Sequence, residues 1–167
     1  MKVLAALLVA IGLSGCAGYR VGDVKPHYLK EIRTIAVPTF INSTFLPRVE
    51  VLVTNTVIKQ LQQDGTFEIA SEDKADAVLR ATITGVGRGP VRSVRGNVLA
   101  TTEFNLGIGV TYALVTKSGQ TIVGPVGVSG GTSFFVGSDV ATEERQALPL
   151  AAEDLAVRLA SQLTEGW

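Results

Sequence analysis

The strongest constraint on the fold is a strict alternation of residue type between residues 103 and 114. The odd-numbered positions carry small or polar residues, including Gly107 and Gly109. The even-numbered positions carry large apolar residues: Phe104, Leu106, Ile108, Val110, Tyr112 and Leu114. Because successive side chains of a strand point to opposite faces, this period of two predicts a half-buried antiparallel strand. The two outer-face glycines indicate a bend or a close neighbour there.

Four further segments have the composition of strands. Residues 77–86 alternate between apolar and polar side chains, and residues 121–135 form a strand loosened by several glycines. A turn at residues 117–120 joins this second segment to the alternating strand as a hairpin. Shorter strands are expected within residues 32–40 and 66–70, which are rich in β-branched and aromatic residues.

Two segments, residues 47–63 and 139–163, have the spacing of amphipathic helices. The polar residues 42–44 offer a cap for the first helix, and Thr142 is the expected cap of the second. Pro149 is expected to kink the second helix or to delay its start. The apolar stripes are Val49, Val53, Val57 and Leu61 in the first helix, and Leu148, Ala152, Leu155, Leu159 and Leu163 in the second.

The order of these elements defines the expected fold class. A strand and a helix are followed by several strands and a last helix, without the regular alternation that builds parallel α/β folds. The sequence therefore predicts an α+β fold. Two helices are expected to pack on one face of a mainly antiparallel sheet of four strands or slightly more.

The N-terminus has the features of an export signal with a lipid-attachment site. Lys2 precedes an apolar run at 3–11, which is too short to span a bilayer. Leu13-Ser14-Gly15-Cys16 resembles the bacterial lipobox, in which the thiol accepts a diacylglyceryl group. Cleavage is expected before Cys16, which becomes the lipid anchor and carries acyl chains such as palmitate. Each buried CH₂ of these chains contributes roughly 0.8 kcal/mol to anchoring.

Three parts of the chain follow from this interpretation. Residues 1–15 are the signal peptide, residues 16–30 are a lipidated tether, and residues 31–167 form one α+β domain. Removal of the signal leaves 152 residues with 14 basic and 15 acidic side chains. A net charge of −1 argues against a general nucleic-acid-binding protein. Since Cys16 is the sole cysteine, no disulfide or cysteine metal site is expected.

The sequence offers little for catalysis. His27 is the sole histidine and falls in the expected tether. No zinc-protease, nucleophile-elbow or phosphate-loop motif is present, and the glycines at 85, 87 and 89 precede no predicted helix. We therefore expect a protein that is not an enzyme and that holds no cofactor or catalytic metal.

Arginines gather in the Gly-rich segment 85–97, which is expected to connect two strands. Arg88, Arg92 and Arg95 lie within eight residues that contain no acid. One interpretation is an ordinary solvated loop. The other is an anion site, because guanidinium groups pair bidentately with phosphate. Lys117 is a further, weaker candidate.

The outer face of the alternating strand also has two interpretations. Its side chains are small and polar, with Glu103 as the only charge. A wet sheet face explains this composition. A face that rests against a partner, such as the polar lumen of an outer-membrane barrel, explains it as well.

Several motifs together resemble the lipopolysaccharide-assembly lipoprotein (LptE-like) family. They cover most of the chain from about residue 16 to residue 163, although Ala17 is an extra residue between the cysteine and the first of them. The motifs are Gly18-Tyr19-Arg20 after the lipobox, the segment 32–38 (IRTIAVP), Asn42-Ser43-Thr44 leading into Val49-Glu50 and Thr54-Asn55, and the segment 75–79 (ADAVL) followed by Thr82-Ile83-Thr84.

This resemblance implies a function at the cell envelope. Members of the family are outer-membrane lipoproteins that face the periplasm and plug a large β-barrel translocon (LptD-like). The pair delivers lipopolysaccharide to the outer leaflet. The family fold has two helices on a four-stranded sheet. The resemblance also suggests lipopolysaccharide, with its phosphorylated lipid A, as the anion for Arg88, Arg92 and Arg95.

Two other classes of protein remain open at this stage. A periplasmic interaction lipoprotein of the curli-assembly or penicillin-binding-protein-activator type also begins with a lipobox and an Ile-Ala-Val-like strand. An envelope hydrolase would need an acidic or histidine site, which the sequence does not offer. The partner distinguishes these classes, since it would be a barrel translocon, a secretion pore or a peptidoglycan synthase.

Overall fold

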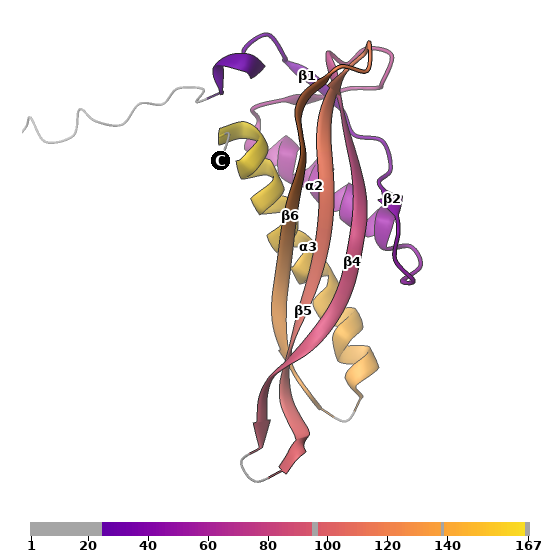
Figure 1. The fold of residues 1–167 in the computed structure, drawn as a ribbon, viewed down its shortest axis with the longest axis vertical. Helices are drawn as coiled ribbons and strands as arrows, with labels where there is room; N and C mark the ends of the chain where they lie inside the picture. The colour runs from indigo at the N-terminus through magenta and orange to yellow at the C-terminus, as the bar shows by residue number, and fades with distance from the viewer. Residues whose placement is uncertain (1–24, 95–96, 138, 166–167) are drawn as a thin grey trace, which may run out of the picture.

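A computed structural model describes residues 25–94, 97–137 and 139–165, with side-chain surroundings for all of these except residues 93–102. Two helices lie behind a long, twisted sheet (Figure 1). In chain order the elements are the 3-10 turn η1 (His27–Leu29), β1 (Thr34–Ala36), β2 (Ile41–Asn42), α2 (Val49–Asp64), β3 (Glu68–Ile69), β4 (Ala77–Val94), β5 (Asn97–Thr116), β6 (Thr121–Phe135) and α3 (Val140–Glu165).

The sheet is mixed and has six strands, with the order β3-β1-β4-β5-β6 and β2 paired to β4. The long strands β4, β5 and β6 are antiparallel neighbours, as predicted. The short strands β1, β2 and β3 are all paired in parallel. The expectation of a mainly antiparallel, four-stranded sheet was therefore only roughly correct. The predicted strand 32–40 is divided into β1 and β2.

The predicted register of the alternating strand is confirmed. Its even-numbered residues from Leu106 to Leu114 are at most 2 % exposed and face the helices. They form one core with the apolar stripes of α2 and α3, in which Val53, Leu155 and Leu159 are fully buried. A Leu, Ile or Val side chain contributes roughly 1.5–3 kcal/mol when it is fully buried. This face of the sheet therefore supplies most of the stability of the domain.

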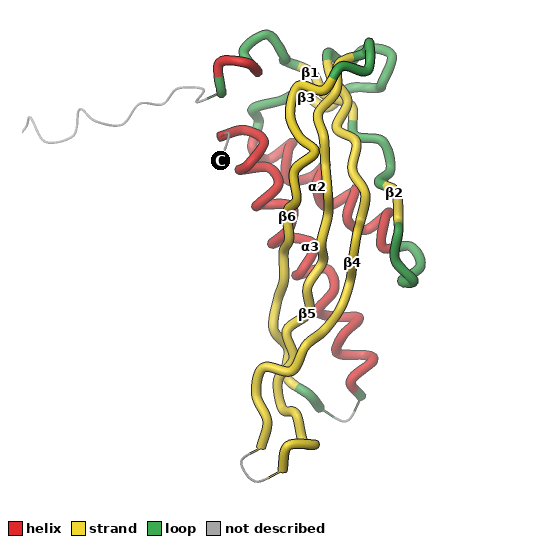
Figure 2. Tube along the Cα trace, viewed as in Figure 1, coloured by secondary structure: helices red, strands yellow, loops and turns green. Residues whose placement is uncertain are grey.

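Both helices cover the same face of the sheet (Figure 2). α3 approaches β6 so closely that a Cβ atom added to Gly130 would lie 2.1 Å from the backbone N of Leu155. The N–H of the next residue, Gly131, donates a hydrogen bond to Asp154 Oδ2 over 2.9 Å. Helix and strand are thus in direct contact here, and only glycine fits at position 130.

The helix ends differ from the sequence prediction. α2 follows Arg48, which has a φ of 67° and makes no side-chain cap, so residues 42–44 do not cap this helix. In α3 the carboxylate of Asp139 accepts the N–H groups of Ala141 and Thr142, and Asp139 is the cap in place of Thr142. Pro149 lies inside α3 and does not delay its start, which is at Val140.

The Gly- and Arg-rich segment 85–97 is not a connection. β4 continues through it as far as Val94, and β5 begins at Asn97. Irregularities in the pairing at Ile83/Gly85 and beyond Pro90 allow this extension to twist away from the body of the sheet. The result is a long hairpin that extends past the helices (Figure 1).

Packing begins before residue 31. Leu29 in η1 is fully buried in the core, and Lys25 Nζ lies 4.7 Å from the centre of the Phe67 ring. These contacts attach the last residues of the expected tether to the domain.

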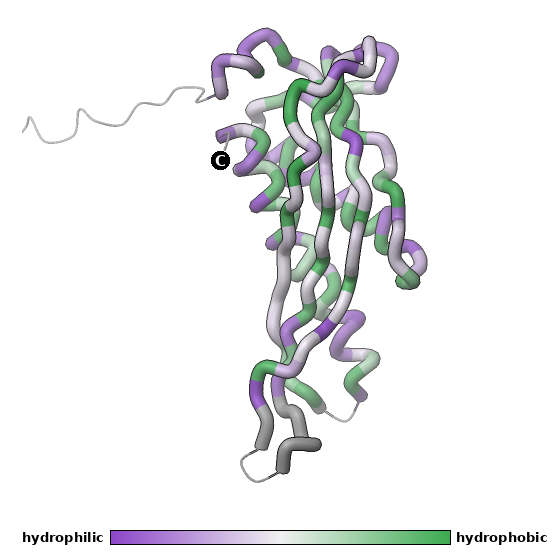
Figure 3. The backbone as a smooth tube through the Cα atoms, in the orientation of Figure 1, coloured by the Kyte–Doolittle hydropathy of each residue, from purple (hydrophilic) through white to green (hydrophobic). Residues whose placement is uncertain are grey.

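In Figure 3 the strands carry mainly near-neutral and hydrophobic colours, while hydrophilic colours are frequent on the helices, the turns and the segment before β1.

Candidate functional site

The face of the sheet opposite the helices is built from small residues. Register pairs across β4, β5 and β6 bring glycines and small polar residues of the three strands side by side on this face. These pairs are Gly85 with Gly109, Gly87 with Gly107, Gly107 with Gly131, Gly109 with Ser129, and Thr111 with Gly127. We call this surface, residues 85, 87, 107, 109, 111, 127, 129 and 131, the outer face.

Packing within the domain does not require several of these glycines. A Cβ atom added to Gly85, Gly87 or Gly127 would meet no atom within 4 Å. None of the three has a positive φ, so the backbone does not demand glycine either. Their absence of side chains leaves a smooth backbone surface that a neighbouring molecule can approach closely.

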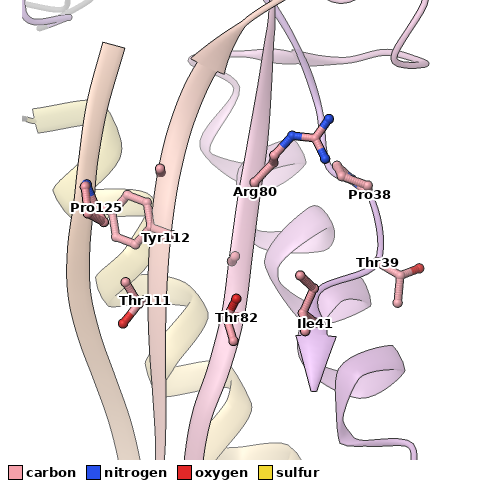
Figure 4. Close-up of a pocket in the computed structure, with 10 residues that line it drawn as sticks. Pro38, Thr39, Ile41, Arg80, Thr82, Thr111, Tyr112 and Pro125 are labelled. Carbon is pink, nitrogen blue, oxygen red and sulfur yellow. The ribbon is translucent and has the colours of Figure 1, made fainter. Parts of the chain in front are cut away.

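A shallow hollow of about 300 Å³ lies at the upper end of this surface. Pro38, from the segment between β1 and β2, and Ile41 of β2 form one wall (Figure 4). Thr82, Thr111 and Pro125 from the three long strands also line it. Arg80 lies at the hollow and pairs at 3.6 Å with Glu72. The walls of the hollow are mostly apolar, and the charge of Arg80 is paired with that of Glu72. Both features favour a contact surface over an enclosed ligand site.

Arg88, the first predicted anion-site residue, faces the helix side of β4, opposite Leu106. Its guanidinium is paired with the carboxylate of Glu144 in α3 and lies 5.3 Å from the centre of the Phe104 ring. The side chain remains 43 % exposed. An anionic ligand would therefore have to share or displace a carboxylate that the sequence places 56 residues away.

Arg92 is opposite Glu103, and its Nε lies 3.8 Å from Glu103 Oε2. Leu106 and Glu103 are three residues apart on β5, so their side chains point to opposite faces. The register thus directs Arg88 and Arg92 to opposite faces of the hairpin. The third candidate, Arg95, lies outside the described residues, as does the lipid-anchor residue Cys16.

Lys117 is distant from the arginines. It lies in the turn between β5 and β6, where its ammonium donates to the backbone O of Asp73 over 3.0 Å. Ala77 pairs with Thr116 at this end of the sheet, and Arg88 lies eleven residues further along β4. At roughly 3.3 Å per residue the separation is about 36 Å. Lys117 and the arginines cannot contact the same phosphate group.

Three carboxylates of the described residues, Asp76, Asp139 and Asp154, have a lowered pKa, in Asp139 through the hydroxyl and then the N–H of Thr142. Arg158, and then the N–H of Gly131, lower the pKa of Asp154. The N–H groups of Thr34 and then Arg33 lower the pKa of Asp76, which ties β1 to the start of β4. These carboxylates accept hydrogen bonds from backbone N–H groups and from neighbouring side chains, including the Thr34 hydroxyl at Asp76, so the shifts indicate structural hydrogen bonds.

The described part of the chain lacks two other features, a cluster of metal ligands and a membrane-spanning helix. Its histidine, aspartate and glutamate side chains nowhere gather in a group of three or more that could hold a metal ion. No helix in residues 25–94, 97–137 and 139–165 is both long and apolar enough to cross a membrane.

Several solved structures share this arrangement, and some of them are described as lipoproteins. A minor lipoprotein from Acinetobacter baumannii aligns with a TM-score of 0.58 and 14 % identity, covering 81 % of this chain and 94 % of that one. Lipoprotein B from Nitrosomonas europaea aligns with a TM-score of 0.52 and 10 % identity, covering 88 % and 86 %. The PelC dodecamer from Paraburkholderia phytofirmans has a TM-score of 0.52 and 18 % identity, covering 80 % and 90 %. At these identities the alignments establish the fold alone.

The family is established by sequence. Residues 32–163 match the family model LptE, described as lipopolysaccharide-assembly. The chain belongs to the lipopolysaccharide-assembly (LptE) family, as the sequence motifs suggested. No curated protein sequence matches the chain.

Proposed function

We propose that this protein is an outer-membrane lipoprotein, anchored through Cys16 and facing the periplasm. It assists lipopolysaccharide assembly as the plug of a β-barrel translocon (LptD-like) and has no catalytic role. The observation that carries the proposal is the family match across residues 32–163, which includes both helices and all six strands. The partner and the location are part of the proposal, and membership of the family supports them.

The outer face is the surface that we assign to the barrel. A plug must lie against a wall of polar, inward-facing side chains. A smooth, nearly uncharged surface of glycine, serine and threonine allows close backbone approach without burying unpaired charge. The helix-covered face cannot have this role, because the core already occupies it.

We also propose that lipopolysaccharide phosphates bind along the extended hairpin, to Arg88 on one face and Arg92 on the other, with Arg95 as a further candidate. A charge-assisted contact contributes roughly 1.5–3 kcal/mol when well made. Arg88 must exchange Glu144 for phosphate, so this ion pair competes with the ligand. Replacing both Arg88 and Arg92 by Ala should weaken lipopolysaccharide binding more than about tenfold.

The competing carboxylate supplies a matched variant. Glu144→Gln keeps the size of the side chain but frees Arg88, and should therefore strengthen binding of lipopolysaccharide. The gain should disappear with dephosphorylated lipid A. If Glu144→Gln and the double arginine variant both bind as the unmodified protein does, the arginine site is wrong, although the family function would remain.

Affinity purification from detergent extracts tests the function itself. The full-length, lipidated protein should co-purify with an outer-membrane barrel, and its depletion should prevent lipopolysaccharide from reaching the cell surface. Mass spectrometry should find diacylglycerol and acyl chains on an N-terminal Cys16. Co-purification with a secretion pore or a peptidoglycan synthase would instead assign the protein to another class.

A further inference from the structure

The loop from Asn42 to Arg48 presents an aromatic side chain to solvent. The relative solvent-accessible surface of Phe45 is 107 %, so the side chain is fully exposed. This is the highest value among the exposed large apolar residues of the described chain. Ile41, at the start of β2, is 65 % exposed. Transfer of an exposed phenylalanine ring from water into an apolar environment is favourable, and aromatic residues are enriched among the anchors of protein interfaces.

Hydrogen bonds hold this loop in a fixed shape. The side-chain amide of Asn42 donates to Leu46 O at 2.9 Å and to Glu50 Oε2 at 2.8 Å. Its carbonyl oxygen accepts from both the N–H and the hydroxyl of Thr44. Leu46 N–H in turn donates to Thr44 Oγ1, and the Leu46 side chain packs against the core. Phe45 therefore lies on a pre-organised support, and little entropy is lost when a partner covers it.

The loop lies where the sheet loses an edge strand. β2 pairs with β4 through Asn42 and Ile83, and Ser43 N–H donates the last hydrogen bond, to Ile83 O. Beyond Ile83 no strand in the described residues pairs with this side of β4. Figure 1 shows β4 continuing past the loop as an outer strand, on the side of the sheet away from η1. An open edge offers unpaired N–H and C=O groups to an incoming strand.

Charge identifies the kind of segment that would fit. Arg48 is exposed, and none of the ion pairs within the described part of the chain involves it. Ile41 also lines the hollow at the upper end of the outer face, so the loop is continuous with the surface assigned to the barrel. A partner segment should therefore combine an apolar side chain with an acidic one.

We propose that an extended segment of the barrel protein docks along the open edge of β4. An apolar side chain of that segment covers Phe45, and an acidic one pairs with Arg48. The inference rests on the proposed function, which supplies the barrel, but the docking loop and its occupant are additional to it. Asn42 acts as a positioning residue, because it holds Phe45 without being required to touch the partner.

Binding of the full-length lipidated protein to the purified barrel in detergent tests this proposal. Phe45→Ser should weaken binding about tenfold or more without lowering the Tm. Phe45→Leu keeps an apolar side chain and should retain most of the affinity. Val157→Ser is the matched control, since Val157 is a 50 % exposed apolar residue on α3. It should bind as the unmodified protein does. If the unmodified protein binds and Phe45→Ser binds equally well, the docking loop is overturned and the proposed function stands. If the unmodified protein does not bind, both are overturned.

The charge and the support of the loop are tested separately. Arg48→Asn keeps a residue that tolerates positive φ, and should weaken binding about threefold at low salt, with the difference fading as salt rises. Asn42→Ala should weaken binding although Phe45 remains. Hydrogen exchange of residues 84–91 should slow in the complex. Unchanged exchange of this segment would exclude the β4 edge as the docking site.

A photo-crosslinking residue identifies the occupant directly. Replacement of Phe45 by p-benzoylphenylalanine should give a cross-link to one extended, acidic segment of the barrel, identified by mass spectrometry. The same residue in place of Val157 should give no cross-link to that segment. Cross-links to a second copy of this chain, or to lipid alone, would show a different occupant and would overturn the proposal.

Discussion

The two faces of the sheet use glycine for different physical reasons. On the helix side, Gly130 is required because the backbone of α3 occupies the space where its side chain would be. On the outer face, Gly85, Gly87 and Gly127 have open space around them and ordinary φ values. Folding alone explains the first glycine and does not explain the other three. The proposed contact with a partner would account for this surface, where the fold itself does not require glycine.

The same contrast holds for the large side chains. The even-numbered residues of β5 from Leu106 to Leu114 are buried in the core with α2 and α3, whereas the odd-numbered ones from Asn105 to Ala113 carry little side-chain volume. Stability should therefore depend on one face and association on the other. Substitutions that separate stability from association therefore test the comparison between the two faces of the sheet.

Removal of a core side chain should have the largest effect. Leu106 is fully buried, so Leu106→Ala should lower the free energy of unfolding by about 2–5 kcal/mol. The neighbouring exposed residue provides the control, and Asn105→Ser should change it by less than about 0.5 kcal/mol. Urea denaturation of the soluble domain measures both. Equal losses would mean that the assigned faces of β5 are wrong.

Addition of a methyl group at the close helix contact should come next. Gly130→Ala would place Cβ against the backbone of Leu155 and force α3 away from β6. A loss of about 1–3 kcal/mol is expected, measured as a lower Tm. An unchanged Tm would show that α3 does not approach β6 as closely as described.

Loss of the hydrogen bond between Gly131 of β6 and the carboxylate of Asp154 should have a smaller effect on stability, and this effect should depend on pH. The folded protein lowers the pKa of Asp154, so its contribution is present above the ordinary pKa of Asp and is lost as pH falls through the lower folded value. Asp154→Asn should lower stability by about 1 kcal/mol at neutral pH and by less in acid. A difference that does not change with pH would exclude the ionised carboxylate as its cause.

A methyl group on the outer face should have the smallest effect. Gly127→Ala meets no atom and restricts the unfolded chain, so stability should stay within about 0.5 kcal/mol of the unmodified protein or rise slightly. Comparison with Gly130→Ala in the same melting experiment shows whether the two glycines differ as described. Similar losses at both positions would contradict the contrast between the faces.

The sequence predicted the long elements well because their periodicity spans many residues. The even positions of β5 and the stripes of α2 and α3 carry large apolar side chains at regular spacing, and tertiary structure preserves that pattern. β1, β2 and β3 are two or three residues long, which is too short for any period to distinguish parallel from antiparallel pairing. In β4, the glycines that suggested a loop instead lie on an uncovered face of a strand.

The candidate site was less predictable because its partners are distant in sequence. The arginine segment contains no acid, yet Glu144 and Glu103 reach it through the packing of α3 and the pairing of β5. No local pattern contains that information. The exposure of Phe45 was also invisible in the sequence, because a single apolar residue in a short loop forms no periodic pattern from which burial can be predicted. Asn42 and Thr44, which hydrogen-bond to each other within this loop, were expected from the sequence to offer a helix cap, and that expectation did not show where Phe45 points.

The central claim is that the outer face rests against the barrel. The most direct measurement is co-purification with the barrel after a tryptophan is placed on each surface, together with the Tm of each variant. Gly87→Trp and Gly127→Trp should keep the Tm and lose association by more than about tenfold, since a bulky side chain blocks close approach. Val157→Trp on α3 should retain both. If the outer-face variants fold and associate as well as the unmodified protein does, the outer face is an ordinary wet surface and the account is wrong.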